Sequence, residues 1–266
     1  VARLQPRSTP TQTLLRAHVD VVPTPDEWHE SVDAFDNRVV HFAVHHPHRS
    51  LSVVSTVDVE LVTPTPPAAD IPWEAVAAAA SGSADVAPYL AHTLQTPRLA
   101  ELGALTDGIF TAGAGLVAAV HALCHRIFSE FVFDAMFTDV STPLADVLAH
   151  RRGVCQDFAH TAVAALRSIG LPARYVSGYI ETVPPPGMPR LVGVDASHAW
   201  CAVWAGELGW LDFDPTNDQM PPQRHVTVGW GRDYDDVAPV RGVVIGPASS
   251  QSLTVSVDVA ELPTNT

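Results

Sequence analysis

Three side chains that together can perform nucleophilic catalysis occur in order along the chain: Cys155, His198 and Asp214. Cys155 follows Gly153-Val154 and opens a predicted helix, where unpaired N–H groups and the positive end of the helix dipole stabilise a thiolate. A backbone N–H at the same helix tip can stabilise the oxyanion that forms when the thiolate attacks a carbonyl carbon. Position alone leaves a second interpretation open, because a free cysteine is about as often a buried structural residue.

The two partners of the cysteine lie on predicted strands downstream. His198 begins a strand, where its imidazole can take the proton of the cysteine and later protonate the leaving amine. Asp214 ends another strand just before Pro215, and its carboxylate can hold the imidazole in the useful tautomer if the two strands pair. Asp212 lies on the same strand and, by alternation, on the same face. These residues alone therefore leave two candidates for the orienting carboxylate.

The elements that must position these side chains follow from periodicity. From Cys155 onward, apolar residues recur at helical spacing as far as Ile169, and Gly170-Leu171-Pro172 then ends the helix. Short apolar runs separated by turn signals follow, and each predicts a strand. They are Ala173 to Ile180, His198 to Trp204, Gly209 to Phe213, Val240 to Ile245 and Leu253 to Val259. The order of helices followed by a sheet predicts an α+β fold.

The first part of the chain has a different character. Leu51 to Leu61 alternates apolar and polar residues, as does the stretch around Phe42, which predicts antiparallel β structure. A proline-rich segment at 63–72 reads as a stiff linker. We therefore predict a small β-sandwich-like domain at 1–64 and a core at 73–266 that includes C-terminal strands. We expect the first domain to lack its opening strands, which either lie upstream of Val1 or return from the C-terminus.

Four blocks in this order resemble the core of the bacterial transglutaminase-like superfamily. They are Gly153-Val154-Cys155-Gln156-Asp157-Phe158-Ala159-His160, Gly170 to Tyr179, His198-Ala199-Trp200, and Asp214-Pro215-Thr216-Asn217. The N-terminal stretch is similar to the small domain that precedes this core in many bacterial members. The resemblance implies a papain/transglutaminase-like core, in which a helix bearing the cysteine packs on an antiparallel sheet. It places the nucleophile at Cys155, the base at His198 and the orienting acid at Asp214 rather than Asp212.

The resemblance implies a cysteine-dependent hydrolase, a peptidase or amidase, that acts on amide bonds of a peptide or protein through an acyl-thioester. Acyl transfer to an amine is an alternative, since it uses the same triad and differs only in the second nucleophile. A non-catalytic binding or scaffold protein on the same fold is a further alternative.

Several neighbouring side chains are weaker candidates for substrate or oxyanion contacts. Gln156 can line the oxyanion site, although a surface position in the first helical turn fits it equally. Trp200 points the same way as His198 by alternation, although tryptophan is more often a core residue. Tyr175 and Tyr179 lie on the strand after the helix and can frame the cleft. We also expect the proline-rich segment at 181–197 to form a lid beside the base.

Composition narrows the classes of function. The chain has 266 residues, 47% of them hydrophobic and 17% charged, as expected of a globular protein. A net charge of −14 argues against nucleic acid or an anionic membrane as the main partner. Three cysteines form no disulfide framework, so we expect a reducing, cytoplasmic setting. Ligand spacing for zinc and an EF-hand loop are both missing, so we expect no metal and no cofactor; the oligomeric state stays open.

Overall fold

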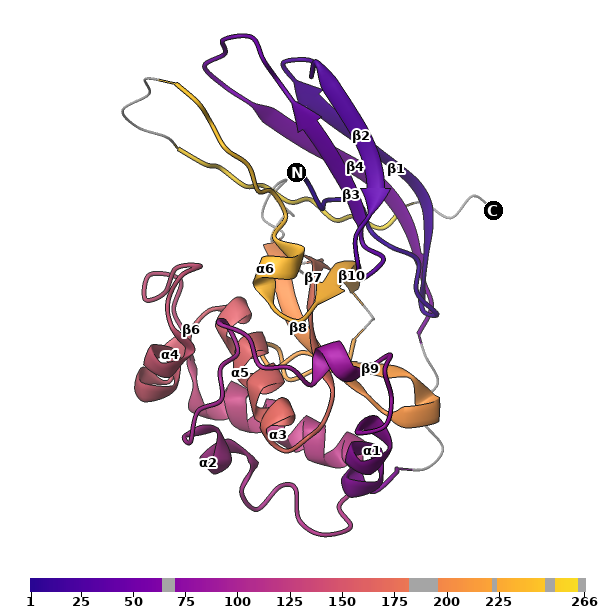
Figure 1. The fold of residues 1–266 in the computed structure, drawn as a ribbon, viewed down its shortest axis with the longest axis vertical. Coiled ribbons are helices and arrows are strands. Elements are labelled where there is room, and N and C mark those ends of the chain that lie inside the picture. Colours follow the sequence, from indigo (N-terminus) through magenta and orange to yellow (C-terminus); the bar gives the residue numbers. More distant parts are fainter. Residues whose placement is uncertain (64–69, 182–195, 222–223, 247–251, 263–266) are drawn as a thin grey trace, which may run out of the picture.

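The computed structural model describes residues 1–63, 70–181, 196–221, 224–246 and 252–262 (Figure 1). The N-terminal strands lie at one end of the molecule, the helices at the other, and a four-stranded sheet lies between them. The predicted α+β fold class is confirmed. Within the described ranges, no helix combines the length and the hydropathy that a membrane-spanning segment needs.

The N-terminal strands form two antiparallel pairs. Strand β1 (Gln12–Val22) pairs with β4 (Ser52–Leu61), and β2 (Glu27–Val32) pairs with β3 (Arg38–Ala43). Their apolar faces bury a small core made of Ala2, Val19, Val21 and Val40. Strands of this length need such a shared apolar face, because an isolated hairpin is only marginally stable in water.

The chain returns to this module from its C-terminal side, but as backbone hydrogen bonds and a single bridge, and not as the additional strand that was one of the two expectations. The backbone N–H of Arg3 donates to the carbonyl of Pro239 at 2.8 Å, and that of Arg241 donates to Val1 at 2.9 Å. Figure 1 shows the chain beyond α6 (Tyr234–Val237) turning back toward the N-terminal strands.

The prediction of two C-terminal strands is wrong. In the described parts of Val240 to Ile245 and Leu253 to Val259, the structure forms only single bridges, one of them between Ala2 and Val240. Apolar residues of these segments, including Val243 and Ile245, are largely exposed. An apolar alternation becomes a strand only where a neighbouring strand and a buried face are available.

The core consists of helices packed on a sheet with strand order β10-β7-β8-β9, in which all neighbours are antiparallel. The strands are β7 (Ala173–Ile180), β8 (Ala196–Trp204), β9 (Trp210–Phe213) and β10 (His225–Gly231). Strand β10 is not among the strands predicted from the sequence. The helices are α1 (Trp73–Ala80), α2 (Leu102–Thr106), α3 (Leu116–Glu130), α4 (Leu144–His150) and α5 (Cys155–Ser168). Shorter pieces are η1 (Ala87–Tyr89), η2 (Gly206–Leu208), and the parallel pair β5 (Val132–Phe133) and β6 (Arg152–Gly153).

Helix α5 is the central element of the core. Its alanines, among them Ala162 and Ala165, are fully buried and let neighbouring elements approach the helix closely. Its first turn is fixed by Asp157, whose Oδ2 accepts hydrogen bonds from the backbone N–H of Val154 at 2.8 Å and from Thr138 Oγ1 at 2.7 Å. A carboxylate at this position satisfies donors that the helix itself cannot satisfy. The helix therefore begins at Cys155 with a well-defined tip.

Candidate active site

The structure brings the three predicted side chains together. Cys155 is half-buried at the first residue of α5, and its sulfur is close enough to His198 on β8 to raise the pKa of that imidazole. The Nε2 atom of His198 lies 2.7 Å from Oδ2 of Asp214. Because Nε2 faces the carboxylate, Nδ1 is the ring nitrogen that remains for the sulfur. Sulfur, imidazole and carboxylate thus lie in order, with a hydrogen bond between the imidazole and the carboxylate and an electrostatic interaction between the imidazole and the sulfur.

The register of the sheet explains how Asp214 reaches the imidazole. In the antiparallel pairing of β8 with β9, Cys201 faces Phe213. Asp214, one residue further, therefore comes beside Trp200, and His198 lies two residues along β8 on the same face. Asp212 comes instead within 3.9 Å of Arg174, and burial raises the pKa of its carboxyl.

Five donors surround the fully buried carboxylate of Asp214. The backbone N–H groups of Thr216 and Asn217 donate to Oδ1, at 2.9 and 3.3 Å. Oδ2 accepts from Nε2 of His198, from Nε2 of His225 at 2.9 Å, and from Nδ2 of Asn217 at 2.7 Å. Burial opposes the charged form, but these hydrogen bonds outweigh it, so the pKa of Asp214 lies well below its ordinary value. Asp214 is a fixed negative charge at neutral pH.

That charge sets the protonation of His198. Burial alone would lower the pKa of the imidazole, but the hydrogen bonds with Asp214 and Cys155 raise it to about 9. An imidazolium is therefore stable beside the sulfur at neutral pH. A thiolate–imidazolium pair is the reactive state of cysteine nucleophiles, and the N-terminus of α5 favours the same state.

The weaker candidates lie in different surroundings. Trp200 is fully buried, with its ring centroid 6.0 Å from that of His198. Tyr175 is buried in a small cluster of side chains that Cys155 contacts. Tyr179 donates its hydroxyl hydrogen to the carbonyl of Leu4 at 3.2 Å, so it joins the core to the N-terminal module. Gln156 is partly exposed in the first turn of α5. Of the predicted lid, residues 182–195 lie outside the described residues.

Two side chains of the site, His225 and Asn217, were not predicted from the sequence. Asn217 belongs to the fourth sequence block, but only the turn after β9 shows that its amide contacts Asp214. His225 precedes the alternating residues of β10, and recognising that strand would have placed a histidine at its start.

One group of described residues has the composition of a metal site. The donor atoms of His198, Asp214 and His225 all lie within 4.8 Å of one another. However, the two histidine nitrogens are 2.7 and 2.9 Å from Oδ2, which are hydrogen-bond lengths. Two ligands of one tetrahedral zinc ion, each about 2.0–2.1 Å from it, lie about 3.3 Å apart. We interpret the group as a hydrogen-bonded cluster and not as a metal site.

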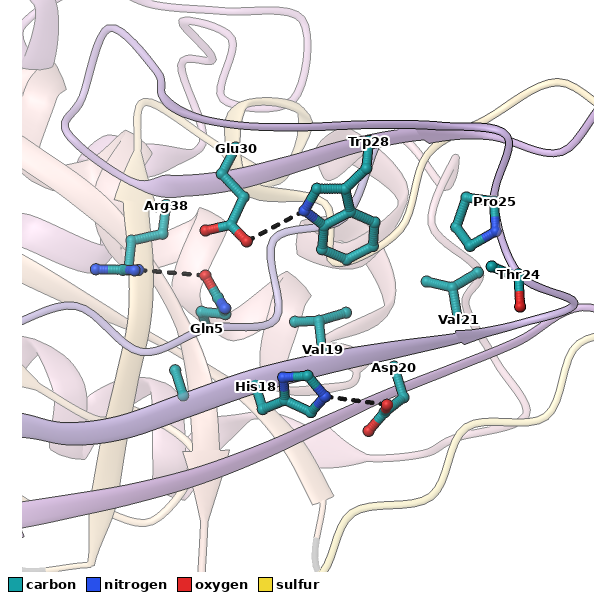
Figure 2. Close-up of a pocket in the computed structure, with 11 residues that line it drawn as sticks. Gln5, His18, Val19, Asp20, Val21, Thr24, Pro25, Trp28, Glu30 and Arg38 are labelled. Carbon is teal, nitrogen blue, oxygen red and sulfur yellow. Dashed lines mark hydrogen bonds and ion pairs between the residues drawn. The ribbon is translucent and has the colours of Figure 1, made fainter.

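A cavity of about 440 Å³ lies elsewhere, in the N-terminal module (Figure 2). Trp28 and Glu30 of β2 face His18 and Asp20 of β1 across it. A second cavity, of about 250 Å³, borders Phe131. Neither is lined by the triad.

His160 lies on the same helix as Cys155 but takes no part in the triad. Its Nε2 accepts the backbone N–H of Tyr234 at 3.1 Å, and its ring packs against Tyr175 with centroids 4.8 Å apart. Burial, with a smaller effect of the Arg167 charge, lowers the pKa of His160 to about 3. The folded protein therefore keeps this imidazole neutral at pH values where the unfolded chain protonates it, near 6.5 and below.

This difference predicts a loss of stability in acid. Between about pH 6.5 and pH 3, His160 is protonated in the unfolded chain and neutral in the folded protein. The free energy of unfolding therefore falls as the pH drops through this range. The loss amounts to about 3 kcal/mol at pH 4. In His160→Gln, whose side-chain oxygen still accepts from Tyr234, urea unfolding at pH 7 and pH 4 should show a difference smaller by that amount. His121→Gln, at an exposed position of α3, is the matched control. Equal acid losses in the two variants would contradict the prediction.

Comparison with known proteins gives consistent results. The family model of the transglutaminase-like superfamily matches residues 104–215, and that of the bacterial transglutaminase-like N-terminal region matches residues 1–60. An uncharacterized protein of Mycobacterium tuberculosis is 39% identical over 273 residues, which covers 96% of this chain and 84% of that protein. A protein-glutamine gamma-glutamyltransferase of Pseudomonas aeruginosa is 41% identical over 125 residues, 46% of this chain and 19% of that protein.

The fold also matches a solved structure. A candidate cysteine protease from Cytophaga hutchinsonii superimposes with a TM-score of 0.73, covering 98% of this chain and 86% of that one. The two sequences are 22% identical, so the match concerns the fold. The two family matches agree with the resemblance seen in the sequence blocks.

Proposed function

The chain belongs to the transglutaminase-like superfamily, and from this premise we propose that it is a cysteine-dependent hydrolase of amide bonds, a peptidase or amidase. The observation that carries the proposal is the arrangement of the Cys155 sulfur beside His198, whose imidazole is hydrogen-bonded to the buried carboxylate of Asp214. A buried carboxylate that is held by five donors behind an imidazole is the kind of arrangement that active sites use to set the pKa of a catalytic group, and this supports an enzyme over a scaffold protein.

The proposed reaction has two halves. His198 holds the proton of Cys155, and the thiolate attacks the amide carbon to form a tetrahedral oxyanion at the N-terminus of α5. His198 then gives that proton to the leaving nitrogen, and an amine departs as the acyl-thioester forms. In the second half His198 takes a proton from water, whose oxygen attacks the thioester. Collapse releases the carboxylic acid and returns the proton to sulfur. Asp214 stays ionised and orients the imidazole throughout.

We propose water as the second nucleophile and a peptide or protein as the substrate. Cys155 is half-buried and Ser197, next to the base, is exposed, so solvent lies close to the reacting groups. Water needs no binding site of its own, whereas an amine must be held beside the thioester. Acyl transfer is the second candidate, favoured by the name of the Pseudomonas aeruginosa relative.

Isotope labelling distinguishes hydrolysis from acyl transfer to an amine. Peptides carrying glutamine and ordinary amide bonds would be incubated in H₂¹⁸O, with and without a primary amine, and followed by mass spectrometry and ammonia release. Hydrolysis puts ¹⁸O into a new carboxyl group whether or not the amine is present. Incorporation of the amine at the expense of ¹⁸O would assign acyl transfer instead. If neither product forms and no thioester is trapped, the enzymatic proposal fails.

We also propose a reducing, cytoplasmic setting. A catalytic sulfur must stay reduced to act, and Cys124, Cys155 and Cys201 are all free. The net charge of −14 supports the proposal that nucleic acid and anionic membranes are not the main partners. Fractionation of the source cells followed by immunodetection tests the location, and recovery with extracytoplasmic proteins would contradict it.

A further inference from the structure

A second histidine contacts the orienting carboxylate of the proposed triad. His225 is the first residue of β10, is fully buried, and places Nε2 2.9 Å from Oδ2 of Asp214. This is the same oxygen that His198 contacts at 2.7 Å. The two imidazoles, with ring centroids 5.7 Å apart, therefore converge on one atom.

The hydrogen bond to Asp214 shows which ring nitrogen of His225 donates. The ionised carboxylate of Asp214 can only accept, so Nε2 of His225 carries the hydrogen. Its Nδ1 is buried and has no hydrogen-bond partner among the described residues. His225 thus donates through Nε2 to Asp214 and offers Nδ1 to none of the described residues, unlike His198, whose Nδ1 faces the sulfur.

The sheet is built so that this contact can form. Strands β9 and β10 are the two outer strands, yet His225 meets Asp214, which directly follows β9. Gly178, on β7 between them, lacks a side chain where a Cβ would lie 2.1 Å from the carbonyl oxygen of Val226 and 2.6 Å from the Trp200 ring. The Trp200 ring fills this space and stands edge-on to His225, with centroids 5.1 Å apart. His225 is held in place by packing on β7 and β8.

We propose that His225 is a positioning residue of the triad. Its hydrogen bond holds Oδ2 of Asp214 where that oxygen meets Nε2 of His198, so that Nδ1 of His198 stays directed at Cys155. This inference rests on the proposed function, and His225 acts on the sulfur only through Asp214 and His198. The superfamily match ends at residue 215, ten residues before this histidine.

Three substitutions test the role. His225→Gln keeps an amide donor near the position of Nε2, His225→Asn has its amide near Nδ1 and cannot reach Asp214, and His225→Leu has no donor. We expect kcat to fall about 10–100-fold in the Asn and Leu variants with little change in KM, because a misaligned base slows the chemical step. The Gln variant should stay within about fivefold of the unaltered protein. Iodoacetamide alkylation of Cys155 should follow the same order.

A merely structural role makes a different prediction. In that case the three variants would differ in their free energies of unfolding, measured with urea. Their kcat and KM values, corrected for the fraction of folded protein, would be equal. Equal kcat values in the Gln and Asn variants would overturn the proposal. This comparison remains available if the Leu variant does not fold. His198→Gln separates this failure from failure of the proposed function. If the unaltered protein alkylates no faster than His198→Gln, the triad itself is inactive.

Discussion

Cys155→Ala is expected to abolish amide hydrolysis and every covalent modification of the folded protein by iodoacetamide. Sulfur forms the acyl bond in the proposed reaction, and a methyl group in its place leaves nothing to attack the carbonyl carbon. The loss in kcat/KM should be at least about 10³-fold, limited by the background of the assay. Steady-state kinetics measures the first effect, and intact-protein mass after alkylation measures the second.

Cys124→Ala is the matched control, because Cys124 is a buried cysteine on α3. The hydrogen bond with Cys201 and burial raise the pKa of Cys124 well above its ordinary value, so it stays an unreactive thiol. This variant should keep its activity and accept one label, at Cys155. Turnover that survives in Cys155→Ala, or a label found on Cys124 in the folded protein, would contradict the account.

Asp214→Asn is expected to reduce kcat about 10²–10⁴-fold. The carboxylate of Asp214 accepts at both oxygens, from two backbone N–H groups at Oδ1 and from three side chains at Oδ2. An asparagine amide must turn its NH₂ group toward one of these sets of donors. Either orientation leaves buried donors facing each other, and His198 loses the negative charge that stabilises its imidazolium. The readouts are kcat and the alkylation rate of Cys155.

Asp212→Asn is the matched control for this change. Asp212 lies two residues earlier on β9, is partly buried beside Arg174, and is the other carboxylate that the sequence offered. Its substitution should leave kcat within about tenfold of the unaltered protein, since it does not contact the imidazole. A larger loss in Asp212→Asn than in Asp214→Asn would reverse the assignment of the two carboxylates.

The sequence predicts those parts of the site that depend on residues close together in the chain. The helix start at Cys155 and the strand at His198 both follow from local periodicity and turn signals. The choice between Asp214 and Asp212 does not follow from such local patterns. Alternation puts both on one face, and only the resemblance, or the register of β8 with β9, distinguishes them.

Contacts between distant parts of the sheet could not be predicted from the local pattern of residues along the chain. His225 reaches Asp214 because β7 carries a glycine and β8 a tryptophan at adjacent points, which no single segment reveals. The prediction of strands in the C-terminal segments is wrong because a local pattern was present but a partner strand was not. Val240 to Ile245 has the alternation of a strand, but apart from the bridge at Val240 no strand of the described chain pairs with it. Residues 239–241 instead contact the N-terminal residues, and Arg241 is 240 positions away from Val1 in the sequence.

The central claim is that His198, steadied by Asp214, activates the sulfur of Cys155. The most direct test is the rate of iodoacetamide alkylation of Cys155 between pH 5.5 and 9, in the unaltered protein and in His198→Gln. An ordinary thiol, with a pKa of about 8.5, loses about tenfold in rate for each pH unit below that value. We predict that His198→Gln follows this fall, whereas the unaltered protein at pH 6 keeps a rate within about fivefold of that at pH 8. Superimposable profiles for the two proteins would contradict the claim.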